Sequence, residues 1–216
     1  MNKSGVKTAS DFSFENIITI FAAFVLPAFT LYFIEVTNTS LSLCFGGITG
    51  SVAIGYCCLK KISGNTLGIN FKLWAIAKII PQTIAIGLVT IFILAIIPWL
   101  NGSSRTLYLQ IEAVWYLAIV IYQEIIWRAF AELLLTKIWG KKQRLIIVSS
   151  AFLFALAHLY FRSLSVVSGS FFFGLFWAKK YSETRTISGV VVSHFCLGLI
   201  LILLNYMGIK DCWHLF

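Results

Sequence analysis

The 216-residue chain has few charged residues: Asp, Glu, Lys and Arg make up 12% of it, about half the share that is usual in soluble domains. Only eight residues are acidic and three are proline, whereas 59% are hydrophobic and 16% aromatic. The mean hydropathy is +0.90. A water-soluble domain of this size cannot bury so much apolar surface. The composition therefore excludes a disordered chain, a disulfide-rich secreted scaffold and an ordinary soluble enzyme, and it indicates a polytopic membrane protein.

The number and positions of cysteine, proline and charged residues exclude further classes of protein. The five cysteines are odd in number and form no CxxC pair, so neither a disulfide framework nor a zinc ribbon is predicted. Few prolines and no Ser/Pro-rich linker leave no boundary between domains, and we interpret residues 1–216 as a single transmembrane domain. The net charge of +9 lies mainly in short loops between apolar runs. This pattern is typical of membrane topology, so no nucleic-acid partner is predicted.

Apolar runs along the chain predict an all-α fold, a polytopic membrane helix bundle of about seven transmembrane helices. The runs are too long and too uniformly apolar for barrel strands. With the N-terminus in the cytoplasm, the inside segments hold twelve Lys and Arg residues and the outside segments three. The positive-inside rule thus favours a multi-pass protein of the cell inner (cytoplasmic) membrane, with the lipid bilayer as a partner. The runs cover residues 17–33, 41–59, 71–100, 113–135, 145–160, 164–178 and 187–207.

Ionisable side chains inside such runs are costly in lipid and are therefore the first candidates for function. The fourth run contains Glu124, Arg128 and Glu132 at intervals of four residues, so they lie along one helix face. The fifth run ends with His158, and the seventh contains His194. If these helices are neighbours, a carboxylate and an imidazole can take a proton from a shared water, and the second imidazole can bind the resulting oxyanion.

Other interpretations of the same side chains remain open at this point. Two histidines and a glutamate can hold zinc, and Glu124 with Arg128 can be a neutralising pair that only lets the helix insert. A proton relay in a small transporter also uses Glu and His. Known intramembrane proteases of other types fit poorly. The sequence has no HExxH motif, and its only aspartates, Asp11 and Asp211, lie near the termini.

Three short motifs in the second half of the chain resemble those of the CPBP family, which groups CAAX prenyl proteases with bacteriocin-processing and Abi proteins. Residues 123–128, Gln-Glu-Ile-Ile-Trp-Arg, are similar to its EExxxR signature. Residues 154–158, Phe-Ala-Leu-Ala-His, match FxxxH, and His194 falls where the HxxxN motif begins. The family-like core covers about 105–207, so the resemblance places the catalytic-type core in the C-terminal four helices.

The resemblance implies a glutamic-type intramembrane endopeptidase that cleaves a peptide or membrane-anchored protein substrate with Glu/His-activated water. It also implies that neither a metal nor another cofactor is needed. In this interpretation His158 is the water partner, His194 an oxyanion donor and Arg128 a structural cation.

Two positions depart from the family motifs, because Gln123 replaces the first Glu and Gly198 replaces the Asn. A glutamine cannot act as a general base. Either Glu124 takes that role, or the protein is a catalytically impaired pseudoprotease that acts as a membrane immunity or client-binding protein. We predict the enzyme, with two kinds of site residue. The catalytic residues are Glu124, His158 and His194, and the supporting residues are Arg128 and Gln123.

Overall fold

The computed structural model describes residues 14–33, 39–100 and 113–203, and in these ranges the chain forms seven continuous helices and no strand. The predicted all-α helix bundle is confirmed, and each apolar run corresponds to one helix. The predicted end of the last run, Met207, lies outside the described residues. In chain order the elements are α1 (Phe14–Ile20), η1 (Phe21–Val25), α2 (Leu26–Phe33), α3 (Thr39–Leu59), α4 (Leu73–Leu100), α5 (Ala113–Gln123), η2 (Glu124–Phe130), α6 (Ala131–Trp139), α7 (Gln143–Leu156), η3 (Leu159–Phe161), α8 (Leu164–Thr184) and α9 (Ser188–Leu203).

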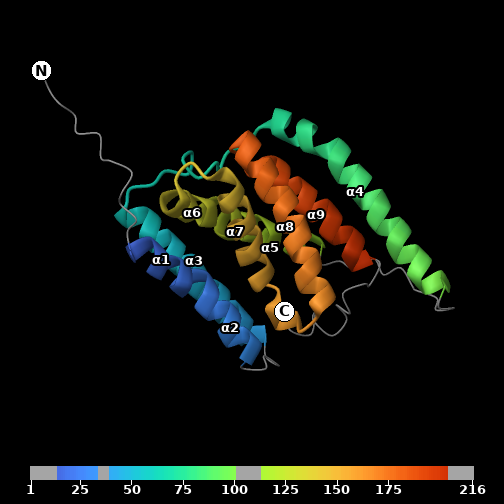
Figure 1. Ribbon diagram of the computed structural model, residues 1–216, viewed down its shortest axis with the longest axis horizontal. Helices are drawn as coiled ribbons and strands as arrows, with labels where there is room; N and C mark the ends of the chain where they lie inside the picture. The colour runs from blue at the N-terminus through green and yellow to red at the C-terminus, as the bar shows by residue number, and fades with distance from the viewer. Residues whose placement is uncertain (1–13, 34–38, 101–112, 204–216) are drawn as a thin grey trace, which may run out of the picture.

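The later helices of the chain are neighbours in space. Figure 1 shows α4 and α9 side by side at one edge, α1 to α3 at the opposite edge, and α5 to α8 between them. The π-helical segment η2 packs against α7, and α5 packs against α9. The fourth, fifth and seventh apolar runs therefore meet, which is the arrangement that a shared site for their ionisable side chains requires.

Two helices are long and apolar enough to cross a bilayer, Leu73–Phe92 and Gln143–Phe161, and three shorter apolar stretches accompany them among the described residues. On α4, Ile84, Leu88 and Phe92 are each more than half exposed. A continuous apolar face of this kind is suited to contact with lipid. Seven crossings of the membrane remain a prediction.

The loop at residues 60–72 is joined to the turn between α8 and α9. The backbone N–H of Ile187 donates to the carbonyl of Gly68 at 3.0 Å, and the Thr186 hydroxyl donates to the carbonyl of Asn70 at 2.7 Å. Both segments carry Lys or Arg residues, which the positive-inside rule predicts on the inside. Their contact places them at one end of the bundle.

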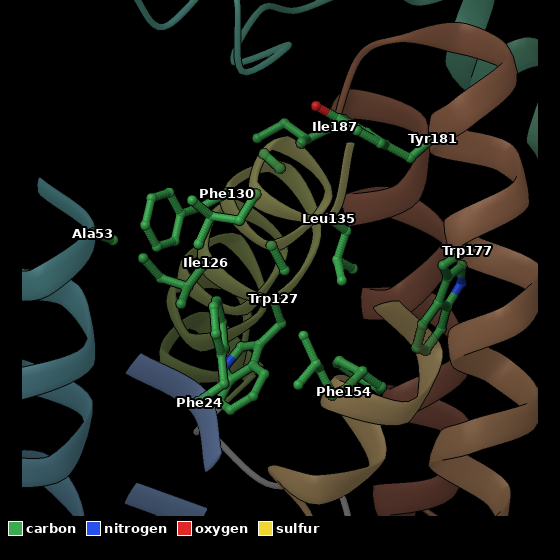
Figure 2. Packing of buried hydrophobic residues seen from close by; sticks show 14 of the residues in the cluster. Phe24, Ala53, Ile126, Trp127, Phe130, Leu135, Phe154, Trp177, Tyr181 and Ile187 are labelled. Atoms are coloured by element: carbon green, nitrogen blue, oxygen red, sulfur yellow. The ribbon is translucent and has the colours of Figure 1, made fainter. Parts of the chain in front are cut away.

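Two π-helical segments face each other across the core. Phe24 of η1 is fully buried and packs edge-on against Trp127 of η2, with ring centroids 4.8 Å apart (Figure 2). Its ring also lies 6.0 Å from that of Phe130. A π-helical turn is wider than an α-helical turn, because its hydrogen bonds join residues five apart, and it therefore redirects the side chains within it. The aromatic contact holds η2, which carries Glu124 and Arg128, against the N-terminal helices.

Helices α7 and α8 approach each other closely at Gly174. A Cβ atom at this position would lie 3.1 Å from the Cα and 3.3 Å from the carbonyl oxygen of Ala151. Small residues at such a contact allow two membrane helices to pack backbone against backbone. Gly169, one and a half turns earlier on α8, has no such neighbour within 4 Å.

We expect Gly174→Leu to lower the stability of the protein by about 1–3 kcal/mol, because the added side chain overpacks the contact with α7. Gly169→Leu is the matched control, and its effect should stay within about 0.5 kcal/mol. Thermal unfolding of the detergent-solubilised protein, followed by circular dichroism, measures both. Equal melting temperatures for the two variants would contradict the close packing of α7 and α8 at Gly174.

Candidate active site

Arg128 is fully buried and connects three helices. Its Nε donates to Oε2 of Glu124 at 3.3 Å, one turn away on the same helix. Its Nη1 donates to the Ser150 hydroxyl on α7 at 2.9 Å and to the carbonyl of Gly174 on α8 at 3.3 Å. Hydrogen bonds to a charged group are stronger than neutral ones. The guanidinium therefore fixes the Glu124 carboxylate relative to α7 and α8.

The second oxygen of the same carboxylate contacts His194 of α9. Glu124 Oε1 lies 2.7 Å from His194 Nδ1, and Glu124 has no exposed surface. A carboxylate only accepts hydrogen bonds, so the imidazole donates from Nδ1. In the neutral ring the lone pair then lies on Nε2. The arrangement thus orients His194 so that its basic Nε2 faces away from Glu124, and no described residue forms a hydrogen bond with it.

Aromatic side chains fix the plane of the His194 ring. Trp177 of α8 stacks on it with centroids 4.2 Å apart, and Phe154 of α7 meets it edge-on at 5.6 Å. The indole N–H of Trp177 donates to the Ser193 hydroxyl at 3.0 Å, which holds the indole itself. Figure 2 shows Phe154 and Trp177 near each other, on α7 and α8. The imidazole is therefore packed on one face by Trp177 and in a T-shaped contact by Phe154, and it is bound at Nδ1.

His158 lies just beyond the end of α7 and contacts the same phenylalanine. Its Nδ1 donates to the carbonyl of Phe154 at 2.9 Å, and the two ring centroids are 4.8 Å apart. Phe154 thus contacts both imidazoles. His158 makes no hydrogen bond to Glu124 among the described residues, and its Nε2 has no protein partner there. The structure therefore joins Glu124 directly to His194 and places His158 beside them across one aromatic ring.

Two polar side chains of the continuous helix α5–η2–α6 have no hydrogen-bond partner within the described part of the chain. Gln123, the last residue of α5, is half-buried, and its side-chain amide is unpaired. Glu132 of α6 is 1% exposed, and neither of its carboxylate oxygens accepts a hydrogen bond. Arg128 Nη2 is also unpaired. Glu124, Arg128 and Glu132, which the spacing placed on one helix face, are therefore all buried. Only Glu124 and Arg128 form an ion pair with each other.

The zinc alternative gains no support from these positions. Within residues 14–33, 39–100 and 113–203, no three His, Cys, Asp or Glu side chains gather closely enough to hold a metal ion.

Sequence reasoning missed several residues that shape the site. Ser150 and Gly174 bind Arg128, and Trp177 stacks on His194. Serine, glycine and tryptophan are common in apolar helices, so nothing in their spacing distinguishes them. They can be recognised only when the neighbours of η2 and α9 are known.

Comparison with known proteins identifies one family. A family model described as "Rce1-like: Type II CAAX prenyl endopeptidase Rce1-like" matches residues 81–200. This range includes Glu124, Arg128, His158 and His194. No curated protein and no solved structure matches the chain significantly.

We expect Arg128→Gln to lower the free energy of unfolding by about 3–5 kcal/mol, because it leaves the buried Glu124 carboxylate without its cation. Arg144→Gln is the matched control, since Arg144 is exposed on α7, and it should leave the unfolding midpoint unchanged. Unfolding of the purified protein in mixed micelles, monitored by tryptophan fluorescence, measures the difference. A stable Arg128→Gln protein would mean that the guanidinium does not hold the three helices together.

Proposed function

Because the chain belongs to the Rce1-like family of type II CAAX prenyl endopeptidases, we propose that it is an intramembrane endopeptidase. The proposed substrate is a peptide or a membrane-anchored protein, and the nucleophile is a water molecule activated by Glu and His. The family supports a membrane protein and, in general terms, a CAAX-type protease. One observation carries the specific mechanism: the buried hydrogen bond between Glu124 and His194.

In the proposed reaction His194 is the general base. Its Nε2 takes a proton from water, and the hydroxide attacks the carbonyl carbon of the scissile peptide bond. Glu124 stabilises the imidazolium that forms, as a carboxylate behind a catalytic histidine does. The C–N bond then breaks, and the proton on Nε2 passes to the leaving nitrogen. No metal or cofactor takes part in these steps.

His158 is proposed to orient the same water. Its Nδ1 is used by Phe154, so Nε2 of the neutral ring can accept the second hydrogen of the water. The family resemblance implies this role for His158, whereas it implies an oxyanion role for His194. We assign His194 as the base because its bond to Glu124 leaves Nε2 with a lone pair and no hydrogen to donate.

The surroundings favour such chemistry. Glu124 and Arg128 have no exposed surface, and aromatic rings pack around both histidines. Electrostatic interactions are stronger in a site from which water is largely excluded. We also propose that the basic end of the bundle faces the cytoplasm and that the protein lies in the inner membrane, which its loop charges support.

We expect His194→Ala and His158→Ala to reduce cleavage about 10²- to 10⁴-fold, because each removes a group that acts on the water. The assay uses protein in liposomes with a farnesylated CaaX peptide and its unprenylated form, and mass spectrometry detects the products. Arg144→Gln is the control and should cleave at the wild-type rate. Equal cleavage by the wild type and His194→Ala would rule out the mechanism.

A second candidate function is that of a pseudoprotease, a client-binding or immunity protein that does not cut. It is favoured by Gln123, which occupies the position of the motif's first glutamate, and by Glu124, whose two oxygens are already bound to Arg128 and His194.

Gln123→Glu separates the two candidates. We expect the wild type to cleave on its own and the substitution to change the rate by less than about tenfold, a barrier change of under about 1.4 kcal/mol. The same liposome assay measures this. Cleavage that appears only in Gln123→Glu would instead identify the natural protein as a pseudoprotease.

A further inference from the structure

The proposed reaction requires a hydrogen-bond donor that the two histidines do not provide. Attack on a carbonyl places negative charge on its oxygen, and donors aimed at that oxygen lower the barrier. His194 and His158 both use their Nδ1–H groups, on Glu124 and on Phe154. The Trp177 N–H is used by Ser193. The donor therefore has to come from another group near the His194 ring.

Tyr116 of α5 lies beside the catalytic imidazole. Its ring meets that of His194 nearly edge-on, with centroids 6.4 Å apart and an interplanar angle of 83°. It also stacks on Phe195, the next residue of α9, at 5.8 Å. Tyr116 is half-buried, and within the described part of the chain its hydroxyl makes no hydrogen bond. The ring is thus held in place while its donor remains available.

The Tyr116 hydroxyl lies against Gly198 of α9. A Cβ atom at residue 198 would overlap both the hydroxyl oxygen and the ring carbon that bears it. Residue 198 is four positions after His194, so it shares a helix face with the imidazole, about 6 Å further along the axis. The hydroxyl therefore occupies the space that any side chain at position 198 would need. Glycine at this position is what admits it.

We propose that Tyr116 is a catalytic residue whose hydroxyl donates a hydrogen bond to the oxyanion formed on the substrate carbonyl. The assignment rests on the proposed hydrolytic function and adds the donor that its mechanism lacks. It also explains the departure of position 198 from the asparagine of the HxxxN motif. A phenolic O–H that enters from α5 replaces a side-chain donor on α9, and the two cannot be present together.

Tyr116→Phe tests the donor without disturbing the packing of the ring. We expect kcat to fall about 10²- to 10³-fold with little change in KM, because the lost bond forms only as charge develops on the oxygen. Tyr122→Phe is the matched control. Tyr122 lies on the same helix, but its hydroxyl is bound to the carbonyl of Gly46. Wild-type kcat in Tyr116→Phe, with cleavage still strongly reduced in His194→Ala, would overturn this proposal and leave the proposed function intact.

A binding measurement distinguishes failure of the donor from failure of the hydrolytic function. A phosphinate analogue of the farnesylated CaaX peptide carries tetrahedral anionic oxygens at the scissile position and needs no turnover to bind. We expect Tyr116→Phe to weaken its binding about 100-fold while Tyr122→Phe binds as the wild type does. Equal binding by Tyr116→Phe and wild type overturns the donor role. Tyrosine-dependent binding by a wild type that cuts nothing supports the donor and overturns only the proposed function.

A paired substitution tests whether the hydroxyl and a side chain at position 198 are interchangeable. Gly198→Asn alone should abolish cleavage, because its Cβ would coincide with the phenol. In the Tyr116→Ala background the same substitution should raise kcat at least about tenfold above Tyr116→Ala alone, since an amide N–H can then take the vacated place. A double variant no better than Tyr116→Ala overturns the donor assignment.

Discussion

The site depends on one buried guanidinium. Arg128 donates hydrogen bonds to an oxygen on each of three helices. These oxygens belong to Glu124 on its own helix, Ser150 on α7 and Gly174 on α8. A buried charge without such partners is strongly destabilising, so the three helices are held where these oxygens converge. The Glu124 carboxylate is fixed as a result, and its second oxygen binds His194. The position of the imidazole on α9 therefore follows from an interaction in which α9 takes no part.

Most of the fold could be predicted from the sequence because lipid constrains it strongly. Seven apolar runs became seven helices, and the basic segments at residues 60–72 and 185–187 meet at one end. What hydropathy does not encode is the local hydrogen-bond register. The π-helical segments at Phe21–Val25 and Glu124–Phe130 lie inside the same apolar runs as the α-helices around them, so their existence and their contact through Phe24 were not predictable from the positions of the runs.

The residues of the candidate site could be predicted from the sequence, but the hydrogen bonds between them could not. Glu124, Arg128, His158 and His194 were found because ionisable residues are rare inside apolar runs, and the structure gathers them around Phe154. Which histidine binds the carboxylate depends on the rotation of α9 against α5, and one sequence does not specify that angle. Tyr116 escaped notice for the same reason, since a tyrosine in an apolar helix is ordinary until its neighbour across the interface is known.

The wide turn at Glu124–Phe130 also determines how this helix can change in length. Inside an ordinary α-helix, the loss of one residue rotates the side chains before it by about 100° relative to those after it. A π-helical turn holds an additional residue in a wider loop, so the helix faces on its two sides stay nearly in register. If one residue of this segment were removed, an ordinary α-helix could form while Tyr116 kept its place against α9. A one-residue gap opened here when related sequences are aligned should therefore be read as a change in the width of the helix, not in the direction of its face.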